Sequence, residues 1–238
     1  MLAAGKGTRL GCTDRPKVML ELNGRPMVDY TVETLEKMGF SPAQIVLVVG
    51  FQKEKVMDHF GDRVTFAHQA EQLGTGHAAY TGMRALPEHI EHVVVMGGDD
   101  SAFYTPTTLA TFINDHVEAV RHLTLLSSEM SDPRSLGRIV RHVDGRVEII
   151  EKELLTEEQK KIKEISTGTF MLHRAWYQQI FPTMPKMEKL GEYGLPTAFT
   201  VARDSGLPHG VVKLDDPDEW FGVNTPEELL EAQRRKGN

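Results

Sequence analysis

The feature that most constrains this chain is its first seventeen residues, Met1 to Lys17, which read MLAAGKGTRLGCTDRPK. A small apolar start runs into Gly5-Lys6-Gly7, and glycines this close together allow positive φ and a close approach of backbone to a ligand. Backbone N–H groups in such a turn, followed by a helix start, form a nest for anionic oxygens. The stretch therefore predicts a polyphosphate site. It holds four cations and one acid: Lys6, Arg9, Arg15, Lys17 and Asp14.

Two familiar phosphate-binding motifs do not fit this stretch. A Walker A loop, Gly-x-x-x-x-Gly-Lys-Ser/Thr, needs a glycine at a fixed distance before Gly5, and none stands there. A dinucleotide fingerprint, Gly-x-Gly-x-x-Gly, fails at Leu10. The phosphate loop is therefore of another kind.

The charge balance excludes some partners. The chain of 238 residues has a net charge of -7, whereas general nucleic-acid binding needs a basic face. An acidic protein that binds anions needs a local concentration of cations, and residues 6 to 17 provide one with four of the 27 Lys and Arg residues. Cys12 is the single cysteine, which rules out an intramolecular disulfide and fits a reducing cytosol.

No apolar run approaches the ~20 residues of a membrane span, and we expect no signal peptide before the glycine loop. We therefore expect a cytoplasmic protein without a membrane partner. A phosphate loop needs a strand behind it, yet only Met1 to Ala4 precede Gly5. We expect part of the first strand to be absent from this sequence.

The first half of the chain alternates short apolar runs with helical patterns, which predicts βαβ units and a parallel sheet. In such sheets ligands bind at the carboxyl ends of the strands. The expected strands are Gln44–Val49, Val64–Ala67, His92–Met96 and His122–Ser127, and the expected helices are Pro26–Met38, Lys53–Phe60, Thr75–Leu86 and Pro106–Val120.

The second half changes character. Asp144-Gly145 predicts the turn of a hairpin, and Thr225-Pro226-Glu227-Glu228 predicts a capped C-terminal helix. We expect one domain, 1–238, with a nucleotide-binding half of about 1–105 and an acceptor-binding half of about 106–238. The other elements expected are hairpin strands Arg138–His142 and Arg146–Glu151, strands Glu164–His173 and Val211–Leu214, and helices Thr156–Lys163, Arg174–Phe181 and Leu195–Ser205.

Two further stretches carry chemistry. Gln69 to Ala78 (QAEQLGTGHA) contains a side-chain amide that can pair with a base edge, a glycine that allows close approach, and Thr75 as a helix N-cap. Asp99 and Asp100 follow the buried strand ending at Gly97-Gly98. Carboxylates in that position suit Mg²⁺, which takes one or two carboxylates together with substrate phosphates.

The residues Leu2-Ala3-Ala4-Gly5-x-Gly7-Thr8-Arg9 with Pro16-Lys17 resemble the signature of the sugar-1-phosphate nucleotidyltransferases, or pyrophosphorylases. The Gln69 stretch is very similar to that of the uridylyltransferase domain of the bifunctional N-acetylglucosamine-1-phosphate enzymes. The resemblance implies a Rossmann-like three-layer α/β fold with a mostly parallel sheet, helices on both faces and a small β-hairpin subregion for the acceptor. We expect no counterpart of the left-handed β-helix domain of the bifunctional enzymes within these 238 residues, since they contain no hexapeptide repeats.

By this resemblance the catalytic residues are Arg9 and Lys17, and the metal ligands for Mg²⁺ are Asp99 and Asn224. The nucleotide-binding residues are Leu2, Ala3, Ala4, Gly5, Lys6, Gly7, Gln69, Gly74 and Thr75. The sugar-phosphate-binding residues are Gly137, Glu151, Ser166 and Asn224.

The acceptor half departs from the family's pattern at several positions. Asp100 and Ser101 stand where the family carries an apolar residue and then proline. Ser166 stands where the N-acetylglucosamine enzymes carry asparagine, and Gly194 and Pro196 stand where they carry tyrosine and threonine. These differences leave the identity of the sugar open.

The resemblance implies transfer of a nucleotidyl group from an NTP, UTP foremost, to a sugar 1-phosphate, with Mg²⁺ as cofactor and pyrophosphate as product. Three alternatives stay open. The base could be that of dTTP, GTP or CTP, the acceptor could be a non-sugar phosphate, or the chain could be a non-catalytic nucleotide-sugar-binding regulatory protein. The sequence leaves the oligomeric state open, a homo-oligomer included.

Overall fold

The computed structural model describes residues 1–133, 136–187 and 190–237. Strands β1 (Leu2–Ala3), β4 (Val46–Val49) and β5 (Thr65–His68) pair in parallel, in the order β1-β4-β5. A parallel bridge between Leu2 and Gly97 joins β1 to the end of β6 (His92–Val95). The carboxyl ends of β1 and β6 therefore lie at the same edge of the sheet, where ligands bind in folds of this type.

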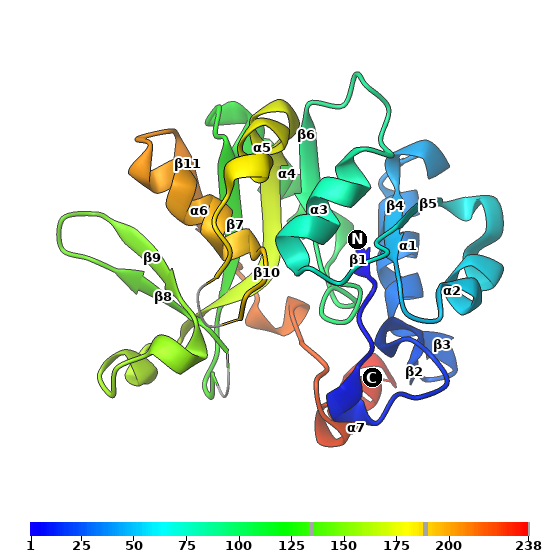
Figure 1. Ribbon diagram of the computed structural model, residues 1–238. Helices are drawn as coiled ribbons and strands as arrows, with labels where there is room; N and C mark the ends of the chain where they lie inside the picture. Colours follow the sequence, from blue (N-terminus) through cyan, green and yellow to red (C-terminus); the bar gives the residue numbers. More distant parts are fainter. Residues whose placement is uncertain (134–135, 188–189, 238) are drawn as a thin grey trace.

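The second half of the sheet is built around the long strand β10 (Glu164–His173), which runs antiparallel to β6, β7 and β8. Strand β7 (Leu123–Glu129) also pairs in parallel with β11 (His209–Lys213). The hairpin of β8 (Arg138–Arg141) and β9 (Val147–Ile150) projects from this half (Figure 1). The expected α/β fold with parallel strands and a separate hairpin is confirmed.

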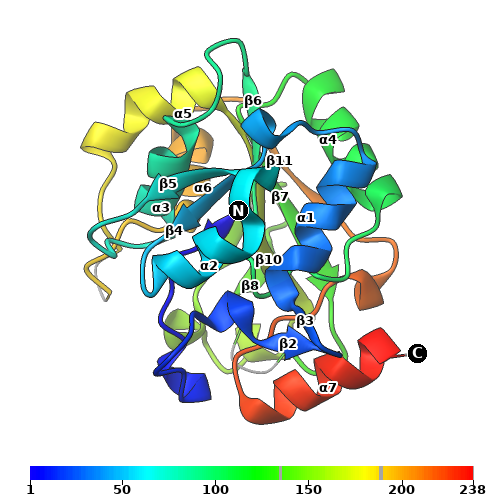
Figure 2. The same cartoon turned by 90° about the vertical axis from the view of Figure 1, so that its right-hand side faces the viewer.

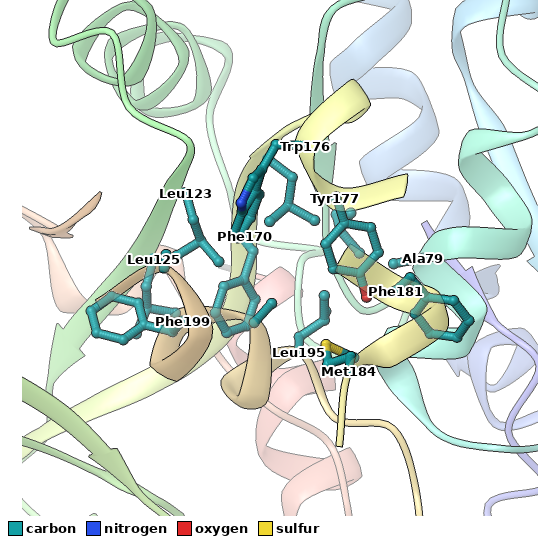
Figure 3. Packing of buried hydrophobic residues seen from close by; sticks show 14 of the residues in the cluster. Ala79, Leu123, Leu125, Phe170, Trp176, Tyr177, Phe181, Met184, Leu195 and Phe199 are labelled. Atoms are coloured by element: carbon teal, nitrogen blue, oxygen red, sulfur yellow. The ribbon is translucent and has the colours of Figure 1, made fainter. Parts of the chain in front are cut away.

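Helices cover both faces of the sheet (Figure 2). One face packs against α3 (Thr75–Met83), α5 (Arg174–Ile180) and α6 (Leu195–Asp204). The other packs against α1 (Met27–Lys37), α2 (Lys53–Phe60) and α4 (Pro106–Glu118). Figure 3 shows the largest core cluster, where aromatic rings of α5 and α6 meet apolar side chains of β7 and β10. None of the helices in the described ranges has the length and apolar character that a membrane crossing requires.

The C-terminal helix α7 (Pro226–Gly237) lies beside a small hairpin of β2 (Glu21–Leu22) and β3 (Arg25–Pro26). This hairpin is absent from the sequence-based expectation, although Asn23-Gly24 is a strong turn signal. Both turn residues have positive φ, 53° and 80°. The capping box of α7 is confirmed, because Glu228 N donates to Thr225 Oγ1 and Thr225 N donates to Glu228 Oε2.

The expected helix Thr156–Lys163 is wrong. The segment holds only a 3₁₀ turn, Gln159–Lys161. Its side chains are mostly exposed, so no apolar face stabilises a longer helix. Its ion pairs, Glu157–Lys160 and Glu158–Lys161, are spaced three residues apart, which suits the 3₁₀ geometry. The remaining predicted elements are present, with ends that differ by a few residues.

A group of histidines lies where β6, β7, β10 and α4 meet. The His116 side chain is fully buried, and its Nδ1 lies 2.8 Å from Thr124 Oγ1 while its Nε2 lies 3.0 Å from His92 Nδ1. The rings of His173 and His92 are 5.3 Å apart. Burial, with the neighbouring His92, Arg121 and His173, lowers the pKa of His116 from 6.5 to about 4.

We predict that acid destabilises the fold through His116. Between pH 6.5 and about pH 4, His116 binds a proton in the unfolded chain but stays neutral in the folded protein, because folding lowers its pKa. The free energy of unfolding should fall by up to about 3 kcal/mol over this window from His116 alone. Urea unfolding of the wild type and of His116→Gln at pH 7 and pH 5 checks this, with the exposed His89→Gln as control. Equal pH dependence of the wild type and His116→Gln would contradict it.

Candidate active site

Lys17 joins three segments at the carboxyl edge of the sheet. Its Nζ forms an ion pair with Asp99 Oδ2 and donates to Asn224 Oδ1 at 2.9 Å. The Lys17 and Asp99 side chains are 13% and 27% exposed, so the pair is largely shielded from water. Arg9 Nη2 donates to the same Asn224 oxygen at 3.3 Å. The four residues predicted to handle phosphate and metal therefore form one cluster.

The glycine loop passes directly over Lys17. Gly7 has φ +70°, and a Cβ there would lie 2.8 Å from Lys17 Cβ. Within the described residues, the backbone N–H groups of Gly5, Lys6 and Gly7 donate no hydrogen bond. Unpaired donors beside two cations suit an anionic ligand, because such groups bind oxygens without reorganisation.

Asn224 is held by the cap of α7. Its backbone N–H donates to Glu228 Oε2 at 2.6 Å, and its neighbour Val223 donates to Asp99 O at 3.2 Å. The second of these bonds ties the segment before α7 to the loop after β6. The Asn224 amide oxygen and an Asp99 carboxylate oxygen both contact Lys17 Nζ, so two oxygens converge on one cation. This donor set fits Mg²⁺, which prefers oxygen ligands.

A cleft of about 290 Å³ opens beside this cluster. All four acceptor-side residues predicted from the sequence line it, and so does Thr75, which was expected to contact the base. Glu151 and Gly137 lie together, since a Cβ at Gly137 would come within 3.5 Å of Glu151 Oε2. Burial, with the nearby Glu153, raises the pKa of Glu151. The predicted residues in the lining are Thr75, Asp99, Gly137, Glu151, Ser166 and Asn224.

Asp99 and Asp100 share one small space. A Cβ at Gly97 would lie 2.8 Å from Asp99 Oδ1 and 2.7 Å from Asp100 Oδ1. Only a glycine therefore allows both carboxyl groups to fold back over this position. Burial and the neighbouring Asp99 charge raise the pKa of Asp100.

The loop from Gln69 to Ala78, which was expected to contact the base, is less open than the sequence indicates. The Gln69 side chain is only 4% exposed, and its Nε2 donates to Gly74 O at 3.2 Å and lies 3.0 Å from His77 Nδ1. Gln72, which sequence reasoning did not select, donates from Nε2 to Ala4 O at 2.6 Å. It thereby links this loop to the glycine loop.

The same loop is bonded to the segment that precedes α6. Gly76 N donates to Tyr193 O at 2.7 Å, and Tyr193 N donates to Leu73 O at 2.8 Å. Thr75 Oγ1 accepts from Leu195 N at 3.2 Å, so this hydroxyl is already engaged. Gly74, with φ +103°, leaves no room for a side chain against Tyr193 O, which lies 2.6 Å from its Cβ position.

Other predicted residues lie outside the cleft. Leu2 and Ala3 form β1, and Ala4 is buried behind the loop. Lys6 is exposed. Trp220 and Gly168 also line the cleft, and of these two the sequence analysis missed Trp220. Trp220 Nε1 donates to Thr167 O at 3.1 Å, a contact between segments far apart in the sequence that leaves no local signal.

Comparison with known proteins identifies the class. Residues 1–133 match the model of the MobA-like NTP transferase domain, and the chain belongs to this family of nucleotidyltransferases. The resemblance drawn from the glycine loop is thus confirmed. Among relatives, the chain is 36% identical over 238 residues to the bifunctional protein GlmU of Symbiobacterium thermophilum, covering 99% of this chain and 50% of that protein.

A second relative, the bifunctional protein GlmU of Geobacter metallireducens, is 37% identical over 98% of this chain and 49% of its own length. The chain thus spans about half the length of these curated relatives. Solved structures with the same fold include a putative glucose-1-phosphate thymidylyltransferase of Bacillus anthracis in complex with sucrose, at TM-score 0.78 and 19% identity over 98% of this chain and 92% of that one. HddC of Yersinia pseudotuberculosis with GMP-PN matches at TM-score 0.73 and 20% identity, over 99% and 97% of the two chains.

We predict that Gly97→Ala impairs turnover while preserving the fold. The three atoms nearest to the new Cβ belong to the ends of the Asp99 and Asp100 side chains, which can rotate away at little cost to stability. Displacing Asp99 should lower turnover at least ~10-fold, which corresponds to ~1.4 kcal/mol in the barrier. Steady-state kinetics and thermal melting check this, with Gly237→Ala as the control glycine. Wild-type turnover in Gly97→Ala would contradict it.

Proposed function

We propose that this protein transfers a nucleotidyl group from an NTP, UTP foremost, to a sugar 1-phosphate and releases pyrophosphate. The observation that carries the proposal is the Lys17–Asp99–Asn224 cluster at the mouth of a cleft lined by Gly137, Glu151 and Ser166. The relatives named GlmU and the thymidylyltransferase of the same fold support this substrate class. The similarity of the Gln69 stretch to uridylyltransferases supports UTP.

In this proposal residues 1–238 act as one domain. The half of about 1–105 binds the nucleotide, and the half of about 106–238 binds the acceptor. The backbone amides of Ala4 to Gly7 cradle phosphate oxygens, and Gln69, Gly74 and Thr75 form the base side of the site. Leu2, Ala3 and Lys6 complete the nucleotide-binding set.

The reaction needs little beyond positioning and charge stabilisation. An oxygen of the sugar phosphate attacks the α-phosphorus in line, the bond from that phosphorus to the β-phosphate oxygen breaks, and pyrophosphate leaves with the bonding electrons. The nucleophile is already an anion, so no side chain has to remove a proton. Lys17 and Arg9 stabilise the charge on the phosphates as it shifts towards pyrophosphate.

Asp99 and Asn224 would hold Mg²⁺ through the two oxygens that now converge on Lys17 Nζ. When bound, Mg²⁺ neutralises phosphate charge and orients the phosphate oxygens. Lys17 keeps Asp99 and Asn224 in place in the ligand-free protein. Its ammonium is then within reach of phosphates that enter the site. On the acceptor side, Gly137, Glu151, Ser166 and Asn224 hold the sugar phosphate.

A matrix of nucleotides and acceptors tests the proposal. UTP, dTTP, GTP and CTP are each combined with hexose, amino-sugar and N-acetylamino-sugar 1-phosphates and with phosphorylated alcohols, in Mg²⁺. Pyrophosphate release is measured. Turnover with UTP and a sugar 1-phosphate is expected. Tight nucleotide-sugar binding without pyrophosphate release in any combination would instead indicate a regulatory protein.

We predict that Lys17→Ala lowers turnover by roughly 10- to 100-fold. Charge-assisted hydrogen bonds of this kind contribute ~1.5–3 kcal/mol each, at ~1.4 kcal/mol per factor of ten in rate. Pyrophosphate release at saturating UTP and sugar phosphate is the measurement, and the exposed Lys160→Ala serves as the matched control. Near-normal turnover in Lys17→Ala would refute the role of this residue.

A further inference from the structure

Asp100 is a half-buried acid at the edge of the cleft, and one of its two carboxyl oxygens has no hydrogen-bond partner. Its Oδ1 is shielded from water and forms no hydrogen bond in the described part of the chain. Lys17 pairs with the neighbouring Asp99, while Asp100 has no ion pair with any residue that the structure describes. A buried carboxyl oxygen without a hydrogen-bond partner is unfavourable, and such an atom in a native structure calls for an explanation.

The second oxygen of Asp100 faces open space. A Cβ at Gly168 would have Asp100 Oδ2, 3.6 Å away, as its only neighbour within 4 Å. Gly168 has φ +77° and lies where β10 shifts its register between Ser166 and Phe170. A side chain at Gly168 would fill the space in front of the Asp100 carboxyl group. The register shift in β10 places Gly168 beside this oxygen, and Asp100 and Gly168 line the same cleft.

The surroundings of Asp100 indicate which part of a ligand it meets. Asp100 lines the same cleft as Gly137, Glu151 and Ser166. The cations Arg9 and Lys17 contact Asn224 and Asp99 instead, so phosphates are attracted to their side of the site. A second acid beside Asp99 repels phosphate. It can, however, accept a hydrogen bond from a neutral hydroxyl group.

We propose that Asp100 is a specificity-determining residue that accepts a hydrogen bond from a hydroxyl group of the acceptor sugar. This inference rests on the proposed function and goes beyond it by adding a group that distinguishes acceptors by their hydroxyl pattern. A carboxyl group built to receive a hydroxyl rejects an analogue that lacks it, because the carboxyl group is then left unpaired. Asp100 acts beside Glu151, so the cleft presents two acids to the hydroxylated body of the acceptor.

The test compares wild type, Asp100→Ala and Asp100→Asn, with the exposed Asp58→Ala as a control. The acceptor is the sugar 1-phosphate that the wild type uses in the matrix, together with its monodeoxy analogues. We expect Asp100→Ala to raise the KM for the acceptor roughly 10- to 100-fold. The KM for the nucleotide and the half-saturating Mg²⁺ concentration should stay within about twofold. Asp100→Asn keeps an oxygen that can accept a hydrogen bond, so its KM for the acceptor should lie between those of the wild type and Asp100→Ala.

One deoxy analogue should identify the hydroxyl group. The wild type should use this analogue as poorly as Asp100→Ala uses the parent sugar, and Asp100→Ala should not distinguish the two. Thermal melting gives a readout besides activity. Removal of a half-buried acid beside Asp99 should leave the melting temperature equal to or above that of the wild type.

Two results would overturn the proposal. One is an unchanged acceptor KM in Asp100→Ala. The other is a shift in Mg²⁺ dependence or nucleotide KM in place of the acceptor effect, which would make Asp100 a metal or phosphate residue. If the wild type turns over no pair in the matrix, the proposed function fails separately. Calorimetric titration with the sugar 1-phosphates then tests the role of Asp100 in acceptor binding. Equal binding by the wild type and Asp100→Ala would reject this role, and weaker binding by the variant would support it.

Discussion

One ammonium group organises the carboxyl edge of this sheet. Lys17 Nζ contacts both Asp99 and Asn224, residues 82 and 207 positions away along the chain. The local backbone is arranged around this contact. Gly7 lets the loop cross Lys17, Gly97 makes room for the carboxyl group, and the cap of α7 fixes Asn224. In a ligand-free site that must attract phosphates, Lys17 also screens the negative charge of Asp99.

Local signals predicted most of the fold. Strands β4 and β6 are apolar runs followed by glycines, which predicts buried strands. The capping-box sequence at Thr225 predicts the start of α7. The helix predicted over Thr156–Lys163 is wrong because its helically spaced charges are not accompanied by an apolar face. Packing of such a face decides whether a segment of this kind becomes helical. The β2–β3 hairpin was overlooked because its strands are only two residues long, too short for alternation to show.

The candidate site could be predicted for those residues whose position follows from a short motif or from the end of a strand. Lys17, Asp99 and Asn224 each follow a short motif, and parallel β1 and β6 bring the first two to one edge. Trp220 and the open space beside Gly168 arise from contacts across the fold, so no local pattern carries them. Whether Asp100 Oδ1 finds a hydrogen-bond partner likewise depends on its neighbours in the folded protein, which the sequence alone does not reveal.

The hydrogen bonds between the loop before α3 and the segment before α6 have a mechanical consequence. Tyr193 exchanges backbone bonds with Leu73 and Gly76, and Leu195 donates to Thr75. A displacement of one segment must break these bonds or displace the other segment with it, so the two segments are mechanically coupled. A ligand that displaces the loop before α3 must therefore also displace the segment before α6, or lose these bonds.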